Sequence, residues 1–406
     1  MSLEWKYEKL GKLCSFDKES INPIKDIEYY HYSFPAFDNN KEPEVEMGQD
    51  IKSSKFLFNK GDILFNKLNV KFKRVWDIDF DINENSICST EFIPIQAKHI
   101  DRNFLYYCLI SPNFTNEMKY LSTGTSNSHQ RINPKDIKDY DLFLPIDKEI
   151  QRKIGHILKL LDKKISINTE INKNLLQLSK VIFKNWFVEF EPFGGVQPNN
   201  WKICTLEDVC DLKAGGDKPD VVSDEITDTC SYPIYSNGLD KDGLYGYTDQ
   251  AKIFEESVTV SARGTIGFVC LRHIPYLPIV RLVSVIPKKE FISAKYLYLF
   301  LDRLNIMGTG TTQQQLTIPD FKKTEILVPT LDIIKSFTNY ITPIFKKIWI
   351  QEEEIKKLQK LRDTLLPKLM SGEIDVSKIN CDMLMKKWKL ILNNFTSPNN
   401  LIKVIV

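Results

Sequence analysis

The sequence predicts an α/β (α+β) protein in which two similar globular halves alternate with two long helices. Two observations indicate this: short apolar segments recur at a nearly constant offset, and a long helical pattern follows each set. Of the 406 residues, 42% are hydrophobic and 27% charged, with 55 Lys and Arg against 53 Asp and Glu. This composition excludes long disorder and a fibrous chain, and the length suits two to four domains.

Each half opens with the same residues, because Trp201 follows Trp5 by 196 positions. The matching residues are Trp5-Lys6, Leu10 and Leu13-Cys14 in the first half and Trp201-Lys202, Leu206 and Val209-Cys210 in the second. At the same offset Phe58 corresponds to Phe254, and Lys67 corresponds to Arg263. Each basic residue comes after a predicted buried strand.

The second part of each half repeats at a slightly shorter offset. Residues 122–126 (STGTS) resemble residues 308–312 (GTGTT), and an apolar strand later ends at Pro145 or Pro329. The intervening segments, about 17–57 and 212–253, show no such agreement. The halves therefore share a scaffold and differ where a surface could vary.

A first long helix is predicted from Lys148 to about Phe187, because this segment has no proline and only one glycine. Its apolar seam consists of Ile154, Ile157, Leu161, Ile171, Leu175, Leu178 and Ile182. Lys164 and Asn168 interrupt the seam, as polar residues that set register do.

A second long helix is predicted from Leu331 to about Leu369, where Pro343 predicts a kink or a break. Its seam consists of Ile341, Phe345, Ile348, Ile355, Leu358, Leu361 and Leu365. Residues 351–353 interrupt it near the middle, so two helices of similar layout could pair. A helix with one narrow apolar seam needs a partner to bury it.

These features together resemble the DNA-specificity (S) subunit of a type I restriction-modification system, over roughly residues 1–376. The resemblance rests on the order of the matching motifs. They are the openings at Trp5 and Trp201, the SARGTIG segment at 261–267, the STGTS and GTGTT segments, the strand ends at Pro145 and Pro329, and LLPKLMSGEI at 365–374.

The resemblance implies two target-recognition domains of mixed α/β structure, each reading one half of a split DNA site, with two helices paired antiparallel between them. The implied segments are 1–145 and 191–330 for recognition and 146–190 and 331–376 for the helices, with 377–406 unassigned. Its implied partners are double-stranded DNA, two methylation subunits and restriction-translocation subunits. S-adenosylmethionine, ATP and Mg²⁺ are expected in those partners.

No catalytic or cofactor motif is found in this chain. It has no Pro-Pro, which the base-gripping turn of an amino-methyltransferase needs, and no GxxxxGK[ST] phosphate loop. Its eight cysteines and five histidines are scattered, so no metal site is expected. Because the catalytic motifs are missing, we expect a non-catalytic protein.

No signal peptide or membrane-spanning segment is evident, so we expect the protein to be cytoplasmic. The alternative is a coiled-coil scaffold or adaptor without sequence-specific DNA binding.

Cations and amides on loops are the candidate DNA-binding residues, because phosphates position a duplex and base edges specify it. They are Lys67, Lys71, Lys73, Arg74, Gln130 and Arg131 in the first half, and Arg263, Thr265, Arg272, Gln313, Gln314 and Gln315 in the second. Candidate partner-binding residues are Trp186, Phe187 and Trp349. Each has a structural alternative: a solvated strand face for 71–74, a brace at Gly264 for Arg263, a scaffold turn for the glutamines, and packing of the helix ends for the aromatic residues.

Overall fold

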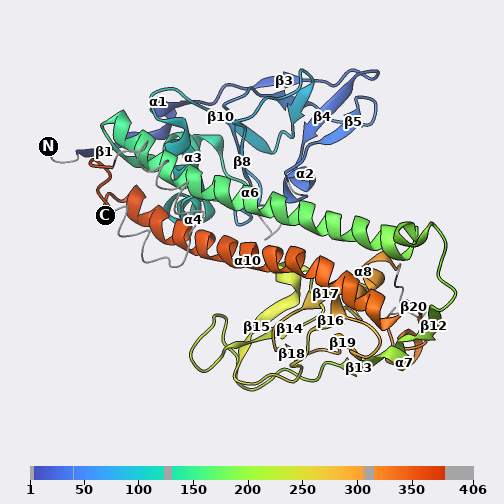
Figure 1. Ribbon diagram of the computed structural model, residues 1–406. Helices are drawn as coiled ribbons and strands as arrows, with labels where there is room; N and C mark the ends of the chain where they lie inside the picture. The colour runs from blue at the N-terminus through green and yellow to red at the C-terminus, as the bar shows by residue number, and fades with distance from the viewer. Residues whose placement is uncertain (1–3, 40, 123–129, 305, 307–314, 380–406) are drawn as a thin grey trace. The chain divides into compact units, whose positions relative to one another are not determined.

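The computed structural model describes residues 4–39, 41–122, 130–304, 306 and 315–379 (Figure 1). The chain forms two compact units. Unit 1 combines Met1–Asn168 with Glu353–Val406, and unit 2 is the continuous segment Thr169–Glu352. Each unit therefore contains one globular half and a part of both long helices, whereas the sequence-based segments treated each helix separately.

Unit 1 contains three sheets and five short helices besides its share of the long ones, within its described residues. Its strands are β1 (Trp5–Lys9), β2 (Cys14–Ser15), β3 (Glu19–Ile21), β4 (Glu28–Tyr32), β5 (Glu44–Met47), β6 (Lys55–Leu57), β7 (Ile63–Asn66), β8 (Val75–Asp77), β9 (Ser86–Cys88), β10 (Phe92–Ala97) and β11 (Asp141–Pro145). Its short helices are α1 (Leu10–Leu13), α2 (Phe34–Asp38), α3 (Arg102–Ile110), α4 (Pro112–Leu121) and α5 (Pro134–Lys138).

Unit 2 also has three sheets in the part of the chain that is described. Its strands are β12 (Lys202–Thr205), β13 (Cys210–Ala214), β14 (Tyr232–Tyr235), β15 (Leu244–Thr248), β16 (Ser257–Val260), β17 (Val269–Arg272), β18 (Leu277–Pro278), β19 (Val283–Pro287) and β20 (Glu325–Val328). Its short helices are η1 (Glu191–Phe193), α7 (Leu206–Val209), η2 (Asp240–Gly243), α8 (Ala294–Arg303) and α9 (Ile318–Phe321).

The repeat seen in the sequence is a repeated pair of sheets, which we call the shared frame. In unit 1 it consists of β1-β11 and β2-β10-β7-β8, and in unit 2 of β12-β20 and β13-β19-β16-β17. The strand order is the same in both units. The third sheet differs: unit 1 has five strands in the order β3-β6-β9-β4-β5, and unit 2 has three in the order β15-β14-β18. The segments without sequence agreement thus contribute most of the parts that differ in fold.

The register of the repeat is shifted by one residue from the sequence-based alignment. Ile63 pairs with Ile95 in unit 1, as Val258 pairs with Val285 in unit 2, so the offset here is 195. Phe58 accordingly matches buried Ile253, whereas Phe254 is 63% exposed. The expected match of Lys67 with Arg263 is therefore wrong, because a shift of one residue turns a strand's side chains to the opposite face.

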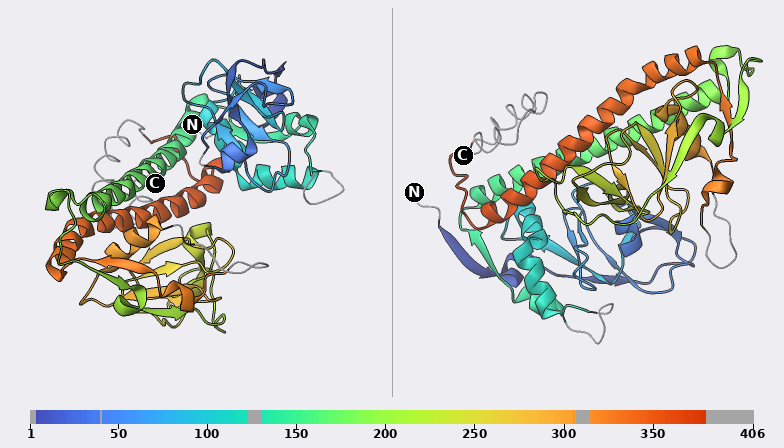
Figure 2. Two further views of the ribbon diagram at one scale, coloured as in Figure 1. Left: turned by 90° about the vertical axis from the view of Figure 1, so that its right-hand side faces the viewer. Right: turned by 90° about the horizontal axis from the view of Figure 1, so that it is seen from below.

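The two long helices are α6 (Lys148–Phe187) and α10 (Leu331–Met370), as the sequence predicts. They lie side by side within each unit (Figure 2). In unit 1, Arg362 Nη1 donates to Asp162 Oδ1 at 2.8 Å and Asn168 Nδ2 donates to Glu354 Oε2 at 2.9 Å. The residue number rises along one helix as it falls along the other, so the pair is antiparallel.

Pro343 does not break α10, which is helical on both sides of it. Proline has no N–H to donate to the carbonyl four residues earlier. The helix is nevertheless held to its unit on both sides of the proline, because Ile341 and Phe345 are buried in the core. The predicted break is therefore wrong.

The apolar seam of α6 is confirmed for five of its seven residues. Ile154, Ile157 and Leu161 are buried, and Leu175 and Ile182 pack partly buried against the core of unit 2, but Ile171 and Leu178 are exposed. The buried face continues through Asn168, Ser179, Phe183 and Phe187. The prediction is wrong for Ile171 and Leu178, because polar residues such as Asn168 and Ser179 occupy part of the buried face.

Gly155 of α6 allows α3 to pack against this helix. A Cβ atom there would lie 2.7 Å from the main-chain nitrogen of Phe104 and 2.8 Å from Cβ of Asn103. Replacing glycine by alanine inside a helix normally stabilises it by roughly 0.5–1 kcal/mol. Here the added methyl group would be too close to main-chain atoms of α3, so the two helices would have to shift apart.

We expect Gly155→Ala to lower the free energy of unfolding by about 1–3 kcal/mol, as overpacking of a core does. Denaturant unfolding of the full chain measures this. Ser166→Ala, at an exposed position of the same helix, is the matched control and should be neutral or slightly stabilising. Equal or higher stability of Gly155→Ala would contradict the packing argument.

Candidate nucleic-acid interface

In both units the loop after the central frame strand is bonded to the segment before the short helix α5 or α9. The Ile132 main-chain N–H donates to Lys67 O at 2.9 Å in unit 1, and that of Leu316 donates to Ala262 O at 3.0 Å in unit 2. The frame thus holds two distant loops together in the same way twice. Loops held by a rigid scaffold are where binding residues usually lie.

The unit 1 loop brings Lys67 close to Gln130 and Arg131. The N–H of Asn69 donates to Gln130 O at 2.8 Å, and Leu68 forms a bridge with Arg131. Arg131 remains 60% exposed, although its guanidinium pairs with Glu91 at 2.7 Å. The structure therefore joins three of the predicted residues in one surface region.

Two lysines that sequence reasoning missed join this region. Burial lowers the pKa of Lys18, and the charges of Lys67 and Lys138 lower it further. Lys18 and Lys138 also lie over the rings of Phe56 and Phe16, with Nζ 5.4 Å and 5.5 Å from the ring centres. No local pattern could have identified this cluster, because its members come from distant segments.

Arg74 is committed to an internal contact. It donates to both carboxylate oxygens of Asp38, at 2.9 Å and 2.6 Å, and its side chain is only 14% exposed. This bonding lowers the pKa of Asp38. Lys71 and Lys73 of the same loop are exposed. The structure therefore favours these lysines over Arg74 as contacts for a polyanion.

In unit 2 the SARGTIG segment forms the loop between β16 and β17. Gly267 N–H donates to Ser261 O at 2.9 Å, while Arg263 and Thr265 are exposed. Gly264 and Gly267 have φ of 69° and 82°, the left-handed region that glycine adopts without strain. The sequence of the loop thus serves to display its two polar side chains.

Arg272 does not lie at the surface, although the sequence placed it among the candidate DNA-binding residues. Its side chain is buried and donates to Thr259 Oγ1 at 2.9 Å and to Asp242 O at 2.6 Å. The guanidinium also lies 3.6 Å from the ring centre of Tyr235. Because its donors are used inside the fold, Arg272 supports neighbouring loops and is not available to a duplex.

Of the three predicted glutamines, only Gln315 is described; its Oε1 accepts from Arg263 Nη2 at 3.4 Å. Gln313 and Gln314 lie outside the described residues, as do most of the STGTS and GTGTT segments and the tail beyond residue 379.

The predicted partner-binding aromatic residues pack mainly within unit 2. Phe187 is buried against Phe337 and Tyr296, with ring centres 4.8 Å away in each case. Trp186 is half-buried beside Phe337, and Trp349 stacks on His273 at 4.0 Å. These contacts favour the packing alternative for Phe187 and leave part of each tryptophan accessible.

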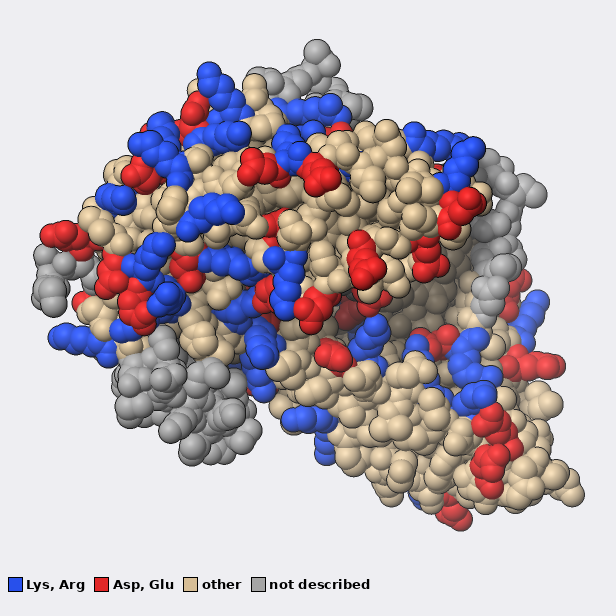
Figure 3. Space-filling view, turned by 90° about the horizontal axis from the view of Figure 1, so that it is seen from above, with Lys and Arg blue, Asp and Glu red and all other residues tan. Residues whose placement is uncertain are grey.

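Basic and acidic side chains are interleaved on the face drawn in Figure 3, among larger areas without charged residues. The local clusters described above therefore matter more for a polyanion than any single large basic area on that face. Among the described helices, none has the length and apolar composition that crossing a membrane requires.

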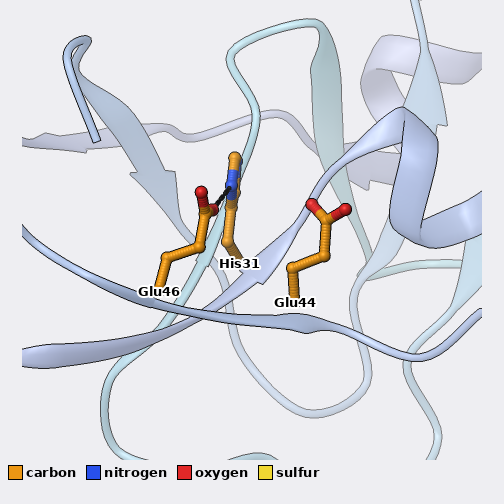
Figure 4. A group of neighbouring side chains, drawn as sticks. All are labelled: His31, Glu44 and Glu46. Atoms are coloured by element: carbon orange, nitrogen blue, oxygen red, sulfur yellow. Dashed lines mark hydrogen bonds and ion pairs between the residues drawn. The ribbon is translucent and has the colours of Figure 1, made fainter. Parts of the chain in front are cut away.

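One group of side chains in the described residues has the composition of a metal site (Figure 4). His31 on β4 faces Glu44 and Glu46 on β5, with potential ligand atoms within 4.8 Å of one another. His31 Nδ1 is hydrogen-bonded to Glu46 Oε2 at 2.5 Å, and Ser33 Oγ donates to Glu44 Oε2 at 2.7 Å. Both carboxylates thus have protein partners, whereas Nε2 of His31 is buried without a hydrogen-bond partner among the described residues.

The described cysteines are free, and all except Cys204 are buried. Burial raises the pKa of the thiols of Cys14 and Cys210 to about 12. Such thiols are not nucleophiles near neutral pH, so they act as small apolar side chains.

Comparison with known proteins agrees with this architecture. The model of the family described as "Type I restriction modification DNA specificity domain" matches residues 2–177 and 198–360. The HindI specificity subunit of Haemophilus influenzae is 27% identical over 420 residues, covering 82% of this chain and 90% of that protein. A putative type I specificity subunit of Mycoplasma pneumoniae is 29% identical, covering 66% of this chain and 74% of its own.

A solved structure has a similar fold. The S subunit of a type I restriction-modification system from M. genitalium superposes with a TM-score of 0.61 at 16% identity, covering 91% of this chain and 96% of the other. Since the family model matches most of the chain, in two copies that agree with the repeated frame, the protein belongs to the family of type I restriction-modification DNA-specificity subunits.

Proposed function

We propose that this chain is the DNA-recognition and assembly subunit of its system, and that each globular half reads one half of a bipartite, non-palindromic site. The observation that carries this is one frame supporting two different sets of loops. Because the two frames are alike, each would present its loops to a duplex in the same way. Because the loops differ in sequence, they would contact different bases. Two unlike half-sites follow.

Contacts in the first half-site are assigned to the cluster of Lys18, Lys67 and Lys138 together with Lys71, Lys73, Gln130 and Arg131. Those in the second are assigned to Arg263, Thr265 and the glutamines at 313–315. The lysines neutralise phosphates and position the duplex, while the amides and arginines are the donors that distinguish bases.

The exposed face of α6 is proposed as a docking surface for the methylation subunits. Within unit 2, Ile171, Leu178 and Val181 of α6 are each 39–47% exposed. Their spacing of three and seven residues is that of a coiled-coil seam. An apolar seam on the outside of a helix that is already paired is suited to a further helix.

Catalysis is proposed to reside in the partners. Methylation subunits would supply S-adenosylmethionine, and restriction-translocation subunits would supply ATP and Mg²⁺. This chain would contribute binding energy and geometry only.

The first test is to co-express the full chain with the methylation subunit of its own system and to map methylated adenines on host DNA by single-molecule sequencing. A split, asymmetric motif that depends on this chain is expected. A stable complex that methylates no motif would instead support a scaffold without sequence recognition.

Changing the seam should abolish assembly while leaving the fold intact. Leu178→Glu combined with Ile171→Glu places two charges on the proposed docking surface, and co-purification with the methylation subunit is expected to fall at least about 10-fold. Lys173→Glu, which adds negative charge at an exposed position on another side of the helix, is the matched control. Unchanged assembly in the double variant, with an unchanged thermal midpoint, would refute this surface.

The helices are proposed to set the length of the unread spacer. Inserting seven residues into α6 after Asn168 and seven into α10 before Glu353 keeps the seam in phase and adds about 10 Å. The spacer in the methylated motif should lengthen by roughly three base pairs. A motif with the original spacer would exclude the helices as its ruler.

A further inference from the structure

A strained turn in unit 2 combines unfavourable residues with high exposure. Val280 and Arg281 both have positive φ, at 52° and 59°, and the N–H of Leu282 donates to Ile279 O at 3.0 Å. Two consecutive left-handed residues closed in this way form the pattern of a type I′ turn, which strongly prefers Asn-Gly. A β-branched residue in this region is a clear outlier.

The surrounding main chain holds this turn in place. The N–H groups of Val280 and Arg281 donate to the carbonyls of Gly216 and Gly215, at 2.8 Å and 3.1 Å. Gly215 is required there, because a Cβ atom would lie 2.8 Å from main-chain atoms of Ile279. The strained conformation is thus imposed by the fold and is not a local preference of its residues.

Asn237 connects this turn to the SARGTIG loop. Its Nδ2 donates to Val280 O at 2.6 Å, and its Oδ1 accepts from the N–H of Ala262 at 2.7 Å. The exposed Arg263 and the turn therefore belong to one bonded loop cluster. Arg272 supports the same region from inside through Asp242 O.

The turn displays side chains that have no role in the fold. Val280 is 50% exposed and Arg281 is exposed. The Arg281 guanidinium makes no hydrogen bond or ion pair with another described residue, in contrast to Arg272. Strain kept at an exposed position by a rigid surrounding is typical of functional sites.

We propose that the Val280–Arg281 turn contacts base edges in the half-site read by the second globular half. Arginine is the side chain that matches guanine O6 and N7, and the valine methyl groups suit contact with a thymine methyl group. This inference rests on the proposed DNA recognition and adds a reading element to it. Neither residue was found from the sequence, because a Val-Arg pair carries no turn signal.

The test uses the full chain co-expressed with its methylation subunit and the same motif mapping. Arg281→Gln removes the charge without changing the backbone requirement. We expect at least about a 10-fold lower methylation rate at the original motif, or loss of preference at one base of one half-site. Val280→Asn with Arg281→Gly installs the preferred turn pair, so its thermal midpoint should rise by roughly 2 °C or more while the same base preference is lost.

Lys323→Gln is the matched control, since it removes one exposed positive charge from the same unit. It should leave the motif and the rate nearly unchanged. The inference is overturned if both turn variants methylate the original motif at the rate of this control. A wild-type complex that methylates no split motif would instead refute the proposed function itself.

Discussion

The antiparallel pairing of α6 with α10 is the contact on which both units depend. In unit 1, Ile154 and Ile157 of α6 share one core with Leu358 and Leu365 of α10 and with the frame strands. Each core is therefore completed by three segments that are distant in sequence. The pair formed by Asn168 and Glu354 sits at the seam and restricts the helices to one register, because a slip would leave these groups buried without partners.

The shared frame separates stability from recognition. Strands of the same order and main-chain bonds of the same pattern carry loops that have little in common. Exposed loop residues can change with little effect on stability, whereas the buried strands tolerate few changes. Such an arrangement lets the loops of one unit change in sequence while its frame stays constant.

Some residues that look like binding residues in the sequence serve the loops from beneath. Arg272 and Arg74 each use their guanidinium within the fold, and Asn237 joins two loops through its amide. Loss of any of them would disturb recognition indirectly. A substitution that abolishes DNA binding is therefore not by itself evidence of a base contact.

The sequence by itself determined the two-fold repeat, the helices at 148–187 and 331 to about 369, and two frame strands in each unit, β7 and β11 in the first and β16 and β20 in the second. These follow from the spacing of apolar residues along the chain, which is a local property. Only the tertiary structure decided three things. The central strands of the two frames align at an offset of 195 residues, Ile171 and Leu178 face outward, and some of the predicted cations are engaged within the fold while others are not. Those depend on partners from distant segments: Asp38 engages Arg74, and the charges of Lys67 and Lys138 lower the pKa of Lys18 only after folding.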